Sequence, residues 1–202
     1  MGRRVRLTRS ESHAQTREQL LVAARQMFAR SGYGGTSVDM IAAEAGYSKG
    51  AIYSNFASKE AIFLELLERY KDEEIAEFSR IMALEDADSR KALLHWLETM
   101  HQDEDWALLT MELALHARRY PAFAKPFYAI EQKLTDFHAG LISELFARRE
   151  RKPPMDPVAL SLIFRTLACG MNLKLAPSRP RAPNEAGRII HELLNLLTDF
   201  PS

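Results

Sequence analysis

Cysteine and long apolar runs are what this sequence most clearly lacks. Its single cysteine, Cys169, excludes an intramolecular disulfide and any zinc site built on two or more thiolates. Its most apolar stretch, 158–171, is interrupted by Arg165, so no 18-residue window could span a membrane. The arginines at positions 3, 4, 6 and 9 have no apolar run behind them and form no secretory signal. We therefore expect a cytoplasmic protein.

A net charge is also missing, because 27 lysines and arginines balance 27 aspartates and glutamates. This balance excludes a protein that binds nucleic acid through a large net positive charge. The charges are nevertheless unevenly distributed. Residues 1–59 contain nine basic and four acidic side chains, a difference of +5, which leaves −5 for the rest of the chain. A basic N-terminal segment suggests a polyanionic partner, although for charge alone chance variation explains the asymmetry equally well.

Strand patterns are missing as well, since no stretch alternates apolar and polar residues and then ends in a hairpin turn. Apolar residues recur at helical spacing instead, with prolines clustered between the apolar stretches. The predicted fold is therefore all-α, with about nine helices. They cover approximately residues 13–30, 38–45, 49–56, 58–82, 90–101, 103–120, 123–151, 156–175 and 184–200.

Two local signals separate the first helix from the second. Gly32 is expected to end the first helix in a left-handed cap. Thr36 is followed three residues later by Asp39, a spacing that is typical of a capping box at the start of a helix.

The segment 41–48 has the spacing of a helix-turn-helix. Gly46 lets the chain reverse, and Ser48 can cap the helix that follows. That helix begins with small and hydrogen-bonding residues, so it could enter the major groove of DNA, where Gly50 and Ala51 would allow close approach to bases. Taken alone this pattern is weakly specific, because many all-helical proteins contain a glycine turn between short helices.

A longer string of residues resembles the N-terminal signature of the TetR family of transcriptional regulators. Its glycines, aromatics and spacing agree with that signature over about 30 residues. The detailed resemblance covers 13–70, and the rest of the chain is similar only in architecture. The string consists of Gly32–Val38, Ile41-Ala42, Ala45–Gly50, Ile52-Tyr53, Asn55-Phe56 and Ser58-Lys59-Glu60.

The resemblance implies a homodimer with one helix-turn-helix per subunit, docked in successive major grooves of a palindromic double-stranded operator. It implies a three-helix DNA-binding domain over 1–58, with a basic N-terminal arm, and a ligand-binding and dimerisation bundle over 59–202. Carried over by position, the DNA-contacting residues are Thr36, Ser37, Ser48, Lys49, Gly50, Ala51, Tyr53, Asn55 and Lys59.

Some of these residues have simpler interpretations. Thr36 and Ser48 could be helix caps and nothing more, and Tyr53 could be a half-buried packing residue. Lys59 could be an ordinary solvated lysine. Asn55 stands where the family often has histidine or tyrosine, and it offers a phosphate neither a charge nor a ring.

In the family, the second half of the chain binds a small effector inside a helical bundle. The body of this chain is rich in large apolar and aromatic residues, which line ligand pockets but also form ordinary cores. The predicted ligand-binding residues are Trp96, Met100, Trp106, His116, Phe123, Phe127, Tyr128 and Asn172.

The last two helices are apolar over a wider arc than a monomer core needs, which favours a dimer interface. Cys169 is expected to pack there as a small hydrophobe. The predicted interface residues are Phe164, Leu167, Met171, Leu193, Leu196 and Leu197.

The sequence thus predicts a ligand-responsive transcriptional repressor that a small, largely apolar effector releases from its operator. A helical enzyme is the first alternative, but the chain has no glycine-rich phosphate loop, no GxSxG elbow and no HExxH helix. A helical interaction module that does not touch DNA is the second, and the basic N-terminal segment argues against it. The histidines lie on different predicted helices, so we expect no metal site and no cofactor.

Overall fold

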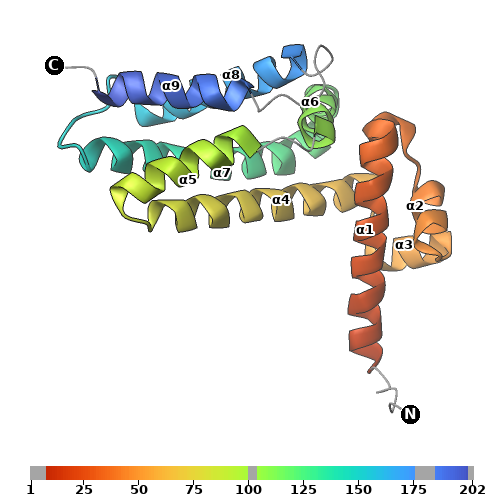
Figure 1. The fold of residues 1–202 in the computed structure, drawn as a ribbon. Helices are drawn as coiled ribbons and strands as arrows, with labels where there is room; N and C mark the ends of the chain where they lie inside the picture. Colours follow the sequence, from red (N-terminus) through yellow and green to blue (C-terminus); the bar gives the residue numbers. More distant parts are fainter. Residues whose placement is uncertain (1–7, 100–103, 176–184, 200–202) are drawn as a thin grey trace. The chain divides into compact units, whose positions relative to one another are not determined.

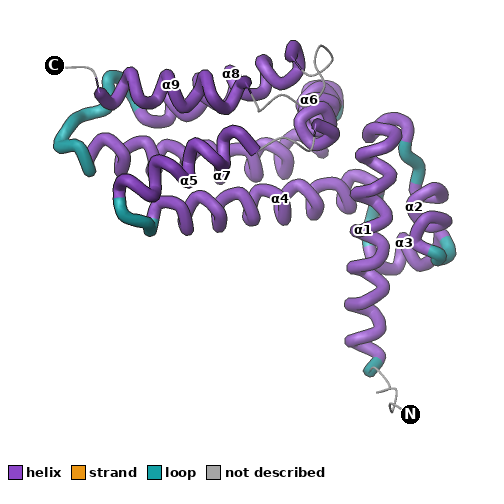
Figure 2. The backbone as a smooth tube through the Cα atoms, viewed as in Figure 1, coloured by secondary structure: helices purple, strands orange, loops and turns teal. Residues whose placement is uncertain are grey.

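The computed structural model describes residues 8–99, 104–175 and 185–199, and over these ranges it contains nine helices and no strand (Figures 1 and 2). The prediction of an all-α fold is therefore confirmed. The chain divides into two compact units, Met1–Leu67 and Glu68–Ser202, which are described separately. The boundary proposed from sequence, between residues 58 and 59, lies at the start of the fourth helix and stays a proposal.

The N-terminal unit contains α1 (Arg9–Gly35), α2 (Val38–Ala45), α3 (Lys49–Asn55) and the first part of α4 (Lys59–Met82). Helix α1 begins earlier than predicted because Thr8 and Glu11 form a capping box. The Thr8 hydroxyl accepts a hydrogen bond from the Glu11 amide at 3.2 Å, and the Glu11 carboxylate accepts one from the Thr8 amide at 2.7 Å.

The end of α1 also differs from the prediction. Gly32 has φ +66° and ψ 176°, which is not the left-handed helical cap expected there, and the chain makes one further helical turn to Gly35. A positive φ at this kink is accessible to glycine at little cost.

The core of the N-terminal unit is built from the apolar stripe that the sequence predicts on α1, together with side chains from the next three helices. Three aromatic rings, those of Phe28, Tyr33 and Phe63, meet with centroids 5.6–6.0 Å apart. The largest fully buried side chains are Leu20, Leu21, Phe28, Ile41, Ile52, Ile62, Phe63 and Leu67. Their packing fixes the surface on which α2 and α3 are presented.

The C-terminal unit contains the rest of α4 and five further helices (Figure 1). These are α5 (Asp86–Thr99), α6 (Glu104–Arg119), α7 (Pro121–Ala147), α8 (Pro157–Leu175) and α9 (Glu185–Asp199). Helix α7 packs against α8, and α5 packs against α9. Pro121 begins α7 instead of lying before it, because proline is well tolerated in the first turn of a helix.

Two apolar clusters hold the C-terminal unit together. The first surrounds Phe78, Leu93 and Ile190, and the second surrounds Ile142 and Phe146. Phe164 packs against both clusters. In the part of the chain that the structure describes, no helix is both long enough and apolar enough to cross a membrane.

Candidate DNA-binding surface and effector cavity

Helices α2 and α3 form the turn that the sequence predicts. Gly46 is left-handed, with φ 72° and ψ 25°, and its amide donates to the last carbonyls of α2. The Ser48 hydroxyl caps α3 by accepting a hydrogen bond from the Ala51 amide at 3.3 Å. Both predictions about this turn are confirmed, and together they set the angle between the two helices.

The cap of α2 is different from the one predicted. Ser37 accepts the hydrogen bond from the Met40 amide, at 3.2 Å. Thr36 is only 2% exposed, and its hydroxyl donates to the carbonyl oxygens of Met27 and Gly32. The predicted capping box at Thr36 is therefore wrong, and Thr36 must also be corrected as a DNA-contacting side chain, since its hydroxyl is held inside the unit.

The start of α3 presents an exposed polar surface. Ser48, Lys49, Gly50 and Tyr53 are all exposed, Tyr53 by 54%. A Cβ atom at Gly50 would meet only the Ser48 hydroxyl, at the ordinary contact distance of 3.6 Å. Packing within the protein therefore does not require glycine there, and the missing side chain leaves room for an external partner.

Lys49 forms an ion pair with Asp39, which joins the start of α3 to the start of α2. The ammonium nitrogen lies 2.9 Å from the carboxylate, and both side chains are more than half exposed. The hydrogen bond from Lys49 to Asp39, and then their charge attraction, raises the pKa of the lysine. The ammonium is thus charged at neutral pH, but a DNA contact would have to compete with Asp39.

Asn55 turns its amide back onto its own helix. The Nδ2 atom donates to the Ala51 carbonyl at 2.8 Å and to the Ser54 hydroxyl at 3.3 Å. The Oδ1 atom is buried and has no hydrogen-bond partner. A phosphate contact from Asn55 would therefore need the amide to give up these bonds.

Two side chains hold this surface in place through contacts that the sequence does not predict. Lys59 donates to the carbonyl oxygens of Tyr33 and Thr36, each at 2.8 Å, and so ties the start of α4 to the α1–α2 connection. Arg17 pairs with Glu65 on α4, donates to the last carbonyl of α3 at Asn55, and stacks over the ring of Phe56 at 4.1 Å. The sequence shows both as charged residues among many, with no signal for their long-range partners.

The C-terminal unit contains a partly open cavity of about 630 Å³. Side chains from all six of its helices line this cavity, and most of them are apolar. Trp96, Phe127 and Tyr128 lie in the lining, as predicted from sequence. His116 and Phe123 do not: the His116 ring stacks on Tyr120 at 4.3 Å and meets Phe123 edge-on at 4.9 Å.

Three other predicted ligand-binding groups cannot be placed in the cavity. Met100 and the side chains of Trp106 and Asn172 lie outside the described residues. The first seven residues of the predicted basic arm lie outside them as well.

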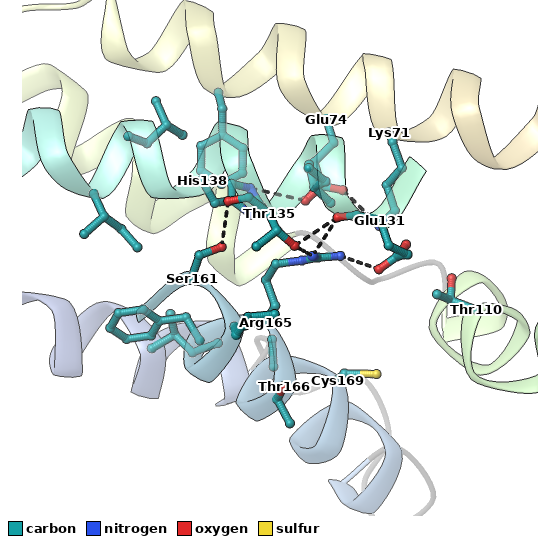
Figure 3. Close-up of a pocket in the computed structure, with 18 of the residues that line it drawn as sticks. Lys71, Glu74, Thr110, Glu131, Thr135, His138, Ser161, Arg165, Thr166 and Cys169 are labelled. Carbon is teal, nitrogen blue, oxygen red and sulfur yellow. Dashed lines mark hydrogen bonds and ion pairs between the residues drawn. The ribbon is translucent and has the colours of Figure 1, made fainter. Parts of the chain in front are cut away.

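One wall of the cavity carries a polar network between α7 and α8 (Figure 3). Arg165 forms an ion pair with Glu131 at 2.5 Å and donates to the hydroxyl of Thr135. Ser161 is buried beside them and donates to the Thr135 carbonyl at 3.1 Å. In the sequence Arg165 is only an interruption of an apolar stretch, yet its guanidinium organises this wall.

A second ion pair faces the same cavity from α4. Lys71 lies 3.4 Å from Glu74, and both side chains are about nine-tenths buried. The Nε2 atom of His138, on α7, lies 3.7 Å from the same carboxylate. Burial lowers the pKa of His138 to about 4, an effect that Glu74 only partly offsets. His138 is therefore neutral at neutral pH.

The sequence contained a usable signal for Lys71 and Glu74. Both continue the helical spacing of the apolar stripe on α4, between Leu67 and Phe78. A charged residue in such a stripe must be paired or must line a cavity. Cys169 also lines the cavity, and burial raises the pKa of its thiol. Among the described residues, no group of His, Cys, Asp or Glu side chains could hold a metal ion.

The predicted dimer-interface residues on α8 and α9 divide into two kinds. Phe164 and Leu197 are half-buried and pack against the internal clusters, so they contribute to the core of one subunit. Leu196 is 54% exposed. On α8, Leu167 packs against the cluster around Phe78 and also lines, with Met171, an open apolar depression in which Leu162 and Ile163 are each 50% exposed.

Comparison with known proteins bears on both units. Residues 20–66 match the model of the family described as bacterial regulatory proteins, tetR family. The HTH-type transcriptional repressor AcnR of Corynebacterium glutamicum is 30% identical over 111 residues, which are 54% of this chain and 54% of that protein. The chain spans about half the length of the curated relatives it matches.

Solved structures share the fold over most of the chain. A TetR-family transcriptional regulator from Agrobacterium tumefaciens has a TM-score of 0.71 and 19% identity, with 92% of this chain and 99% of that one covered. The regulator FadR from Bacillus subtilis, in complex with stearoyl-CoA, has a TM-score of 0.68 and 19% identity, with 90% and 98% covered. At this level of identity, the likeness extends to the fold alone.

Proposed function

Because the chain belongs to the tetR family of bacterial regulatory proteins, we propose that it is a DNA-binding transcriptional repressor controlled by a small molecule. In this proposal a homodimer binds a palindromic double-stranded operator and releases it when an effector enters the cavity. Regulators of this family are not enzymes.

The observation that carries the DNA-binding part is the exposed start of α3. It combines a capped helix N-terminus, a glycine that leaves room for a base edge, and donors at Lys49 and Tyr53. The proposed contact set is Ser37, Ser48, Lys49, Gly50, Ala51 and Tyr53, with Asn55 and Lys59 contributing only when they exchange internal bonds for bonds to DNA. A single α3 reads one half-site, so a palindromic operator needs two copies.

Two observations support control by a small molecule. The cavity of about 630 Å³ lies within the volume range of small-molecule sites, and its lining is mostly apolar. The FadR neighbour was solved with stearoyl-CoA, a ligand with a long apolar chain. We infer that the effector of this chain is also largely apolar.

Helix α4 is the proposed carrier of the signal. Its first turns supply Ile62, Phe63 and Leu67 to the N-terminal core, and its later turns supply Lys71 and Glu74 to the cavity wall. An effector that shifts the later turns would therefore act on the unit that carries α3. Because half-sites lie one helical turn apart, about 34–36 Å, a shift of a few ångströms between the two α3 helices of a dimer would break register.

The experiment begins with selection of a binding sequence from random duplex DNA by the full chain at fixed salt. We expect a palindrome with half-sites one turn apart, and a Kd at least about a thousandfold below that for unselected DNA. Lys49→Ala together with Tyr53→Phe should abolish the enrichment. Enrichment of a non-palindromic sequence, or of none, would contradict the proposal.

A reporter gene placed behind the selected sequence separates repression from activation. Expression should fall when the protein is present and should return to its starting level when an effector is added. Expression that rises with the protein would leave DNA binding intact and refute repression.

A further inference from the structure

Two ion pairs face the cavity, one between α7 and α8 and one on α4, and together they form a polar wall with no net charge. Among the described lining residues, the acidic and basic side chains apart from His138 are two cations, Lys71 and Arg165, and two carboxylates, Glu74 and Glu131. Each cation is paired with one carboxylate, at 3.4 Å and 2.5 Å respectively. All four side chains are at least three-quarters buried, so any net charge brought in by a ligand would find no unpaired counter-ion.

The same wall contains a buried acceptor that lacks a hydrogen-bond donor. The Oε1 atom of Glu131 is buried and accepts no hydrogen bond. Arg165 does not supply one, because it donates to the other carboxylate oxygen, to the backbone of Glu131 and to Thr135. A buried polar atom without a partner destabilises the folded protein, and a ligand that supplies a donor would recover this cost.

The rest of the lining limits a charged part of the ligand to one end. Rings and aliphatic side chains, among them Phe78, Trp96, Leu97 and Phe127, make up most of the remainder, which has polar but uncharged groups such as Thr110 and Thr166. Figure 3 shows the charged side chains gathered between α4, α7 and α8. An apolar body could therefore fill the cavity while a single head group reaches the polar wall.

We propose that the cavity takes an uncharged, largely apolar molecule whose head donates a hydrogen bond to Glu131. This proposal depends on the proposed function in one respect only, which is that the bound molecule is taken to be the effector. A carboxylate or phosphate head would approach Glu131 and Glu74 without a spare cation. An ammonium head would approach Lys71 and Arg165 without a spare anion.

Four probes with the same ten-carbon chain test the head group: 1-decanol, decyl methyl ether, decanoate and decylamine. Binding to the full chain is measured by calorimetry at pH 7 and fixed salt. Decanol should bind about threefold to tenfold more tightly than the ether, which cannot donate. Both charged probes should bind at least about tenfold more weakly than decanol.

Two substitutions should change the preference in opposite directions. Glu131→Gln leaves the wall with one excess cation, so decanoate should gain at least about tenfold relative to decanol. Lys71→Gln leaves one excess anion, so decylamine should gain instead. The matched control is Lys133→Gln, which removes a lysine that pairs with Asp72 across the same two helices, α7 and α4, but is half exposed and lies outside the lining. It should leave the ranking of the probes unchanged.

The outcomes separate this inference from the proposed function. If decanol binds best but leaves DNA affinity unchanged, the ligand class is supported and regulation by this cavity is refuted. If decanoate or decylamine binds wild-type protein best, or if no probe binds, the inference is overturned. If a charged probe binds best and also releases the selected DNA, that release would still support the proposed function.

Discussion

The ammonium group of Lys59 lies over the aromatic ring of Tyr33, 4.1 Å from the ring centroid, and donates to the backbone carbonyl of the same residue at 2.8 Å. One side chain at the start of α4 thus makes a cation–π contact and a charge-assisted hydrogen bond to the end of α1. A second bond, to the Thr36 carbonyl, extends the attachment to the residue before the cap of α2. These contacts give Lys59 a structural task in the N-terminal unit.

Lys59→Met should therefore destabilise the end of α1 and the start of α2. The lost contacts are worth about 1–3 kcal/mol, because charge-assisted hydrogen bonds and a partly desolvated cation–π contact contribute in that range. Hydrogen exchange of the amides over residues 33–40 in the full chain measures the loss directly. Lys125→Met, at an exposed lysine on α7, should leave their protection unchanged.

The salt dependence of DNA binding separates this role from a phosphate contact. If Lys59 acts only within the protein, the slope of log Kd against log salt should be the same for Lys59→Met and wild type. A slope smaller by about one per subunit would show that Lys59 also neutralises a phosphate.

Lys59 also illustrates which contacts can be predicted from the sequence and which cannot. The capped turn at Gly46 and Ser48 was predictable because its signals lie within a few residues of one another. The apolar stripe of α1 was predictable from helical spacing. The partners of Lys59 lie 23 and 26 residues away, and no local pattern encodes which carbonyls a lysine will reach.

Thr36 shows the converse difficulty, in which a local pattern has two solutions. Thr36 and Ser37 both have a hydroxyl at the right distance to cap α2. The backbone turn at Gly32 brings carbonyl oxygens within reach of Thr36, so the threonine turns inward and the serine takes the cap. The ion pair in the cavity wall could not be predicted for the reason that applies to Lys59, because its partners Glu131 and Arg165 are 34 residues apart.

Asp39 should act as a restraint on Lys49. In the free protein the lysine ammonium donates to Asp39, and the carboxylate would also repel the phosphates of a bound duplex. Asp39→Ala should therefore strengthen binding to the selected DNA by up to about tenfold. Titrations at fixed salt measure the change, with Glu44→Ala, an acidic residue at the other end of α2 paired with Arg30, as the control.

Lys49 itself tests whether this residue reads a base. Lys49→Ala should relax the preference at one position of each half-site, because a lost contact to a guanine costs about 1–3 kcal/mol. An unchanged ranking of operator variants would leave Lys49 with phosphate contacts only.

His138 should make the C-terminal unit less stable in mild acid. Its pKa in the folded protein is lowered from 6.5 to about 4, chiefly by burial, with Arg165 and Lys71 adding to the effect and Glu74 opposing it. The folded state therefore binds fewer protons than the unfolded state between these values. The stabilisation is complete above pH 6.5 and is lost as the pH falls toward 4, by about 3 kcal/mol in all.

Urea unfolding of wild type and His138→Gln between pH 7.5 and pH 4 measures this contribution. The glutamine does not titrate, so the variant should lose less stability over the same interval, although carboxylates contribute to both curves. Parallel curves would mean that folding does not lower the pKa of His138.

Exposed apolar residues on α8 and α9 should mediate dimerisation. Ile163 and Leu196 are half exposed, whereas Phe164 packs against both internal clusters of the subunit. Ile163→Glu or Leu196→Glu should therefore convert a dimer into a folded monomer, because the new charge is solvated in the monomer and buried only in the dimer. Phe164→Glu should reduce the helical signal itself, since there the charge would enter a core.

Sedimentation velocity and circular dichroism together distinguish these effects, and the structure supplies a control. Leu115, on α6, is 60% exposed and lies outside the predicted interface, so Leu115→Glu should leave both the mass and the helical signal unchanged. A stable dimer in both Ile163→Glu and Leu196→Glu would place the interface elsewhere. Loss of the dimer in Leu115→Glu alone would place it on α6. Because one α3 reads one half-site, a folded monomeric variant should also lose the preference for a palindrome while keeping affinity for a single half-site.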